Sequence, residues 1–260
     1  MRFLHISDLH YLNDYQGKGG SYHNILSRMD DPFKQLKMII DNCNEAFDFA
    51  IVSGDVCEYG EVEDYLSARK KLDDFLNCPV YVCSGNHDNK DNLIKAFEKK
   101  MTEGELFEVI DVKEARIIML DSSHPEYNDG YISEKSCELL EKTLRENNVF
   151  PLFIVTHHHL LSDQFVMDKA IYPERLEKIV RDSSVTAILT GHTHHIYHGS
   201  FAGKQYHTTG SLSFVADSIE EGLCFYQEPS AVIFEYNTEQ LSFRDIKVQD
   251  DRKVLECWSE

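Results

Sequence analysis

The chain has 260 residues and is strongly acidic, with 45 Asp and Glu against 26 Lys and Arg and a formal net charge of -19. Such an excess of negative charge repels polyanions at long range, so we expect no long nucleic acid among its partners. The length and the 42% content of hydrophobic residues are typical of one large globular domain over residues 1–260. No apolar run approaches the roughly 20 residues that span a bilayer, so we expect no membrane partner.

The cysteines and the N-terminus favour a cytoplasmic protein. Seven Cys without a C-x-x-C pair or regular spacing do not resemble a disulfide framework, which agrees with a reducing compartment. The first residues lack the basic and apolar regions of a secretory signal, and candidate site residues begin at position 8.

Most of the chain alternates between two kinds of segment. Short runs rich in Val, Ile, Leu and Phe predict strands at 2–6, 47–53, 79–84, 115–121, 151–156 and 185–190. Helical periodicity between them predicts helices over 31–47, 62–77, 90–101, 133–147 and 172–182. Strands separated by helices in this way indicate βαβ units and a buried, largely parallel sheet, so the fold class is α/β.

Three regions depart from this alternation. Residues 11–31 hold three Gly and no steady period, which predicts a loop over the site, although a disordered excursion fits equally well. After Gly191, short strands are predicted at 195–203, 204–210, 223–227, 231–237 and 241–248, forming a second or mixed sheet. The polar tail over 251–260 is expected to fray.

Polar side chains follow the predicted strands where each strand ends. Alternation along the first strand would place Asp8 and His10 on the same side, where both could bind the same ligand. Later strands end with further groups: Gly54-Asp55, Asn86-His87-Asp88, the triplet His157 to His159, and His192, His194 and His195. Each group alone is typical of a turn or of a hydrogen-bonded His. Together, at the sheet edge where ligands bind, they provide the ligands of two divalent transition metals.

The residue types suit two-metal chemistry. One ligand must touch both ions, and a carboxylate such as Asp55 offers two oxygens for this. Imidazoles favour transition metals, and the amide of Asn86 adds an oxygen without a charge. Two dications against two carboxylates leave a local positive charge, which can bind one small phosphate ester inside an acidic protein.

These motifs resemble those of the calcineurin-like metallophosphoesterases. The matching blocks are D-x-H at 8–10, G-D-x(n)-G at 54–60, G-N-H-D at 85–88, a His in 156–159 and G-H-x-H at 191–194. The chain is most similar to the bacterial class III cyclic-nucleotide phosphodiesterases, with further likeness at 130–144 and 166–180. The resemblance implies a four-layer α-β-β-α sandwich of two mixed sheets flanked by helices. It also implies one metal on Asp8, His10, Asp55 and His194, and another on Asp55, Asn86, His157 and His192.

The implied function is hydrolysis of a small phosphodiester, a cyclic nucleotide above all, by a hydroxide that bridges two Mn, Fe or Zn ions. His87 would protonate the leaving group, and Glu58 stands where the family has an Asp that orients this His. Within the triplet, alternation places His157 and His159 on one face, and the family pattern selects His157. Tyr11, His23 and Arg28 are weaker candidates for substrate contacts.

Alternatives within the family are a phosphoprotein phosphatase and a nucleotide pyrophosphatase. The protein phosphatases carry D-R-G where this chain has Glu58, Tyr59 and Gly60, and the missing Arg weakens that interpretation. A protein-interaction scaffold without catalysis is disfavoured because all seven ligand positions keep suitable residues. The identity of the metal, the oligomeric state and the physiological substrate do not follow from the sequence.

Overall fold

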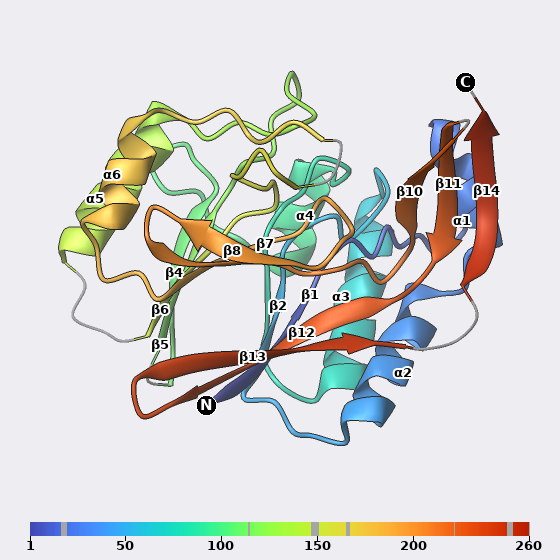
Figure 1. The fold of residues 1–260 in the computed structure, drawn as a ribbon, viewed down its shortest axis with the longest axis horizontal. Helices are drawn as coiled ribbons and strands as arrows, with labels where there is room; N and C mark the ends of the chain where they lie inside the picture. The colour runs from blue at the N-terminus through green and yellow to red at the C-terminus, as the bar shows by residue number, and fades with distance from the viewer. Residues whose placement is uncertain are drawn as a thin grey trace.

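The computed structural model describes residues 1–16, 20–113, 115–146, 151–164, 167–220, 222–248 and 252–259. Two mixed sheets pack face to face and are covered by helices on both outer faces, which is the expected four-layer α/β arrangement (Figure 1). The strands and helices predicted before Gly191 are all present, with ends that differ by a few residues. Edge strand β4 (Phe107–Val112) was not predicted.

The first sheet has the strand order β13-β12-β1-β2-β3. Its strands are β1 (Arg2–Ile6), β2 (Phe49–Val52), β3 (Val80–Val82), β12 (Ser230–Asn237) and β13 (Gln240–Lys247). The neighbours β1, β2 and β3 run parallel, so their carboxyl ends meet at one edge, and β12 runs antiparallel to β1. The helices α2 (Pro32–Cys43), α3 (Val62–Leu76) and α4 (Lys90–Phe97) cover its outer face.

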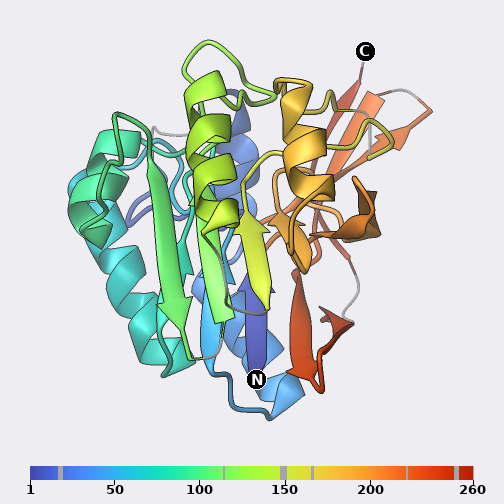
Figure 2. The ribbon, with the colours of Figure 1, turned by 90° about the vertical axis from the view of Figure 1, so that its left-hand side faces the viewer.

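The second sheet has the order β4-β5-β6-β7-β9-β8. Its other strands are β5 (Ala115–Leu120), β6 (Leu152–Val155), β7 (Ala187–Thr190), β8 (Tyr197–Phe201) and β9 (Lys204–Thr208). The strands β5, β6, β7 and β9 are parallel, whereas β4 and β8 are antiparallel edges. Figure 2 shows α5 (Glu134–Arg145) and α6 (Arg175–Arg181) across its outer face.

The space between the two sheets is filled by apolar side chains from both. Phe3 is fully buried there, and its ring stacks between Phe49 and Phe234 at centroid distances of 4.8 and 4.9 Å. Phe153 from the facing sheet meets the same ring edge-on at 5.0 Å. This central layer fixes the two sheets against each other, so the strand ends of both sheets can contribute to one site.

A third, small sheet adjoins this sandwich and corrects two expectations from the sequence. It has the order β10-β11-β14, with β10 (Val215–Ile219), β11 (Gly222–Gln227) and β14 (Lys253–Ser259). The tail expected to fray is therefore a paired strand over Lys253–Ser259, and its Leu255 is buried. Cys224 and Cys257 face each other in register and form a disulfide, which sequence spacing did not indicate.

The region 11–31, expected to be a loop, is partly helical. It contains a 3-10 turn (Gly20–Tyr22) and α1 (His23–Arg28), while residues 17–19 lie outside the described part. Ile25 and Leu26 of α1 pack against Phe225 and Leu255 of the small sheet, and Figure 1 shows this helix beside β14. Among the described residues, no helix is long and apolar enough to cross a membrane.

Candidate metal centre

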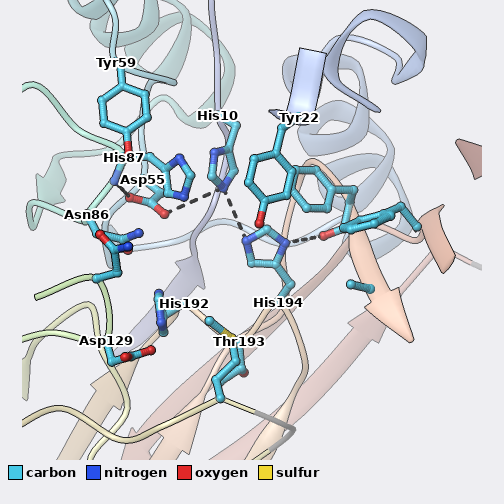
Figure 3. Close-up of a pocket in the computed structure, with 15 residues that line it drawn as sticks. His10, Tyr22, Asp55, Tyr59, Asn86, His87, Asp129, His192, Thr193 and His194 are labelled. Atoms are coloured by element: carbon cyan, nitrogen blue, oxygen red, sulfur yellow. Dashed lines mark hydrogen bonds and ion pairs between the residues drawn. The ribbon is translucent and has the colours of Figure 1, made fainter. Parts of the chain in front are cut away.

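The predicted site residues lie just beyond the carboxyl ends of five strands, β1, β2, β3, β6 and β7. Five of the seven predicted ligands line a cavity of about 280 Å³, namely His10, Asp55, Asn86, His192 and His194. Figure 3 shows His10, His194 and the carboxylate of Asp55 directed toward one another, with Asn86 and His192 nearby. The structure thus brings together all seven residues that the sequence predicts as metal ligands.

The first group of side chains is Asp8, His10 and His194. His194 Nε2 lies 3.2 Å from Asp8 Oδ1 and 3.3 Å from His10 Nε2. The opposite ring nitrogens have protein partners, since His194 Nδ1 contacts the Phe214 carbonyl at 2.5 Å and His10 Nδ1 contacts Glu58 Oε2 at 2.7 Å. These outer contacts hold both rings with Nε2 toward the cavity.

The second group meets the first at Asp55. Asp55 Oδ2 lies 3.7 Å from His10 Nε2 and 3.3 Å from His157 Nε2, so one carboxylate oxygen is near a nitrogen of each group. Asn86 Oδ1 is 3.1 Å from the same His157 nitrogen. His192 Nε2 is buried and has no hydrogen-bond partner among the described residues.

The donor atoms fit bound cations. A neutral His194 that donates Nδ1–H to a carbonyl has a lone pair on Nε2, and a neutral His10 that donates to Glu58 has one too. Two lone pairs 3.3 Å apart repel each other unless a positive charge lies between or beside them. His157 repeats the pattern, with Nδ1 held by the Ser53 carbonyl at 2.7 Å and Nε2 facing oxygens. Convergent nitrogen and carboxylate donors of this kind are the ligands that divalent transition metals take.

The backbone at this edge is turned rather than extended. The φ angle is 55° at Asp8, 47° at His10, 50° at Asp55 and 59° at His194. The prediction that strand alternation places Asp8 and His10 on the same side is therefore wrong. Strand β1 ends at Ile6, and both residues follow it in a left-handed conformation. Non-glycine residues in this conformation are uncommon and cluster at functional sites.

Two motif glycines leave room for ligand side chains from other strands. A Cβ on Gly85 would lie 2.1 Å from Asp55 Oδ1, and one on Gly54, where φ is +106°, would lie 2.4 Å from His157 Nδ1. The Gly of G-N-H-D and the Gly of G-D are thus required by close packing across neighbouring strands.

The three members of the His triplet differ in their contacts. His157 faces Asp55 and Asn86, in agreement with the family pattern. His158 is held on both ring nitrogens, by Ser122 Oγ at 2.7 Å and the Asn128 carbonyl at 3.1 Å. His159 Nε2 contacts the Met167 carbonyl at 3.3 Å. His157 is therefore the member of the triplet whose Nε2 faces the central carboxylate.

Glu58 contacts two imidazoles, where the sequence predicted one. Its Oε2 lies 2.9 Å from His87 Nδ1 as well as 2.7 Å from His10 Nδ1. Burial would raise the pKa of Glu58, but these contacts outweigh burial and lower it to about 2. Burial would likewise lower the pKa of His87, whereas the charge of Asp55 and the contact with Glu58 raise it to about 9. An ionised Glu58 thus pairs with a protonated His87 at neutral pH.

Metal binding is expected to compete with protons at His157. Burial opposes its protonation, but the charge of Asp55 and their hydrogen bond raise the pKa of His157 to about 9 in the metal-free chain. A ligating nitrogen must be deprotonated, so a cation that binds below pH 9 displaces this proton. We predict that the affinity for Mn²⁺ rises about tenfold per pH unit between pH 6 and 8, measured with a competing chelator. An affinity that is flat over this range would contradict the prediction.

Several residues at the site were missed by sequence reasoning. Tyr22, Phe214 and Phe225 line the cavity, and only the 3-10 turn and the small sheet bring them there. The weaker candidates Tyr11 and Arg28 contact other groups, namely Asn13 Oδ1 and the Leu255 carbonyl. Their ranges carried no periodic signal that could have separated Tyr22 from them.

Comparison with known proteins identifies the family. Residues 1–195 match the model of the calcineurin-like phosphoesterases, so the chain belongs to this family, as its motifs indicate. A probable cyclic nucleotide phosphodiesterase of Synechococcus is 30% identical over 153 residues, 58% of this chain and 59% of that protein. A probable glycerophosphodiester phosphodiesterase of Arcobacter nitrofigilis is 33% identical over 168 residues, 60% of each. The matched part therefore spans about 60% of the length of these relatives.

The fold has solved counterparts. The crystal structure of a dimetal phosphatase from Danio rerio superimposes with a TM-score of 0.57, covering 95% of this chain and 98% of that chain at 13% identity. A likeness at this identity demonstrates a shared fold. The small sheet and the strands after residue 195 lie outside the matched family segment.

Proposed function

We propose that the protein is a binuclear metal-dependent phosphodiesterase that hydrolyses a small phosphodiester, above all a cyclic nucleotide. The observation that carries this proposal is the lining of the cavity at the candidate metal centre. None of the described lining residues is Lys or Arg. The side chains of Tyr22, Phe214 and Phe225 line one side of the cavity and form what we call the aromatic wall. A phosphodiester has one negative charge, whereas a phosphomonoester carries nearly two at neutral pH. A site whose positive charge comes from the metals and His87, without Lys or Arg, suits the singly charged ester.

The residues divide into a metal-holding set and a proton-handling pair. Divalent Mn, Fe or Zn ions would be held by Asp8, His10, Asp55, Asn86, His157, His192 and His194, and would supply Lewis acidity and a water of lowered pKa. Glu58 holds His87 by Nδ1, which leaves Nε2 for the cavity that the ring lines. A protonated His87 in this position can donate a proton to the leaving oxygen.

The relatives agree with a diester substrate. The names of both matched bacterial proteins describe phosphodiesterases, one of cyclic nucleotides and one of glycerophosphodiesters. The cyclic nucleotide is preferred here because its flat base suits an aromatic wall, whereas glycerol does not.

A substrate panel tests the proposal. Cyclic nucleotides, linear diesters, monoesters and phosphopeptides are assayed with added Mn²⁺ and with a chelator. We expect diesters to be turned over at least about tenfold faster than monoesters, and chelation to abolish all turnover. Turnover confined to phosphopeptides would replace the proposal by a phosphoprotein phosphatase. Turnover confined to the pyrophosphate bond of a nucleoside diphosphate, assayed beside the panel, would replace it by a nucleotide pyrophosphatase. Turnover that survives chelation would remove the metal mechanism.

A further inference from the structure

We propose that Tyr22 and Phe225, together with Phe214, form a binding site for the planar aromatic arm of the substrate, the nucleobase of a nucleotide. This inference rests on the proposed function and adds the residues that select among phosphodiesters. Tyr22 ends the 3-10 turn at Gly20–Tyr22, Phe214 precedes β10, and Phe225 lies on β11. All three line the cavity at the candidate metal centre.

The aromatic wall lies directly against the candidate metal ligands. The Phe214 ring is 4.6 Å from the ring of His194 and 5.4 Å from that of His10, measured between centroids. Tyr22 is stacked with Phe214 at 5.9 Å, and its ring is 5.9 Å from that of His87. An organic group attached to a phosphate at this centre can therefore reach the aromatic wall, which lines the same cavity. Figure 3 shows Tyr22 above His194, on the side of the cavity opposite Asn86 and Asp129.

The wall is firmly supported from behind. Phe225 is 2% exposed and Phe214 is 6% exposed, so packing holds both rings in place, and the half-buried Tyr22 ring offers the more accessible face. Trp258 of β14 packs behind them, with its ring 4.5 Å from Phe225 and 5.6 Å from Tyr22. A rigid aromatic platform binds a flat ring with little loss of side-chain entropy. Every nucleobase has a π-face, so such a platform favours bases over aliphatic groups.

The origin of the wall supports a role in specificity. Phe214, Phe225 and Trp258 lie beyond residue 195, outside the segment that matches the family. Tyr22 lies within the matched segment, as do the metal-binding motifs. The aromatic surface is therefore completed by residues that lie beyond the matched segment.

The first experiment compares two substrates. The variants Tyr22→Leu and Phe225→Leu are assayed with cyclic AMP and with glycerophosphoethanolamine, a diester without an aromatic arm. We expect kcat/KM for cyclic AMP to fall roughly tenfold in each variant, mainly through KM, because base stacking of this kind contributes about that much. The rate with glycerophosphoethanolamine should change less than about twofold. Equal losses on both substrates, or no loss on cyclic AMP, would overturn the inference.

A control variant and a binding measurement separate this inference from the proposed function. Tyr226→Leu changes the neighbouring residue of β11, whose ring packs on the Arg252 guanidinium, and should leave both rates unchanged. Trp258 is the single Trp of the chain, so its fluorescence reports binding at the wall. Adenosine titrated into chelator-treated protein should change this signal saturably in wild type and in Tyr226→Leu. The affinity for adenosine obtained from this titration should fall roughly tenfold in Tyr22→Leu.

Failure of the proposed function and failure of the aromatic site would give different results. A wild type that binds adenosine but hydrolyses no diester would contradict the proposed function and leave the aromatic site in place. A wild type that hydrolyses diesters but shows no response to adenosine, or the same response in Tyr22→Leu, would contradict the aromatic site alone.

Discussion

Replacing Asp55 by Asn should remove both metals and lower diester turnover at least about a thousandfold. The carboxylate lies near a nitrogen of each ligand group, at 3.7 Å from His10 Nε2 and 3.3 Å from His157 Nε2. An amide of the same shape has no negative charge and only one oxygen to offer, so neither ion keeps a shared ligand. Metal chemistry provides several kcal/mol of transition-state stabilisation, and each 1.4 kcal/mol is about a factor of ten in rate.

The measurement for Asp55→Asn is metal content per chain after dialysis, taken together with turnover. Asp111→Asn is a matched control, since Asp111 lies on β4 and pairs with Arg116 away from the cavity. The control should keep metal and activity. If Asp55→Asn retained two ions per chain, Asp55 would not bridge them.

Replacing His87 by Ala should lower turnover about 10²- to 10⁴-fold while metal content stays the same. His87 lines the cavity but is not one of the seven predicted ligands, and its Nδ1 contacts Glu58 at 2.9 Å. A general acid contributes about this factor. The loss should be much smaller for an aryl diester, because its leaving group needs no proton. Equal losses for alkyl and aryl diesters would contradict proton donation by His87.

The pH profile gives a second test of His87. The pKa of His87 is raised to about 9 in the metal-free chain, against the effect of burial, by Asp55 and Glu58. In the metal-free chain the acid form is therefore present at neutral pH and is lost as the pH rises through that value. Glu58→Gln removes one of the two negative charges, so the alkaline limb of kcat should move to lower pH. Because Glu58 also contacts His10, this variant should weaken metal binding about 10- to 100-fold. An unchanged alkaline limb would contradict the prediction that Glu58 raises the pKa of the proton donor.

The gathering of the predicted ligands at one edge depends on how the two sheets are joined. Asp8, Asp55 and Asn86 follow strands of the first sheet, whereas His157 and His192 follow strands of the second. The buried layer around Phe3 therefore aligns two separate sets of strand ends. A site shared between sheets in this way is rigid, which suits ligands that must be held within a fraction of an ångström.

The sequence by itself determined the alternation of strands and helices and the position of the metal motifs. Both depend on residues that are close together in the sequence. The spacing of apolar residues predicts one helix or strand at a time, and the polar residues that follow each strand predict a site at the edge of the sheet. The motifs also contain Gly54 and Gly85. The structure shows that a Cβ at either position would clash with a predicted ligand, His157 or Asp55. The α/β class follows from these patterns. The family and the grouping of the seven predicted ligands follow from the resemblance of the motifs to those of a known family.

Only the tertiary structure decided what depends on contacts between distant segments. The disulfide joins residues separated by 33 positions, and the 3-10 turn places Tyr22 against Phe225 from the other end of the chain. The contact of Glu58 with both His10 and His87 depends on how β1, β2 and β3 end beside one another. Strand pairing and side-chain packing set these contacts, and neither leaves a periodic pattern in the segments that it brings together.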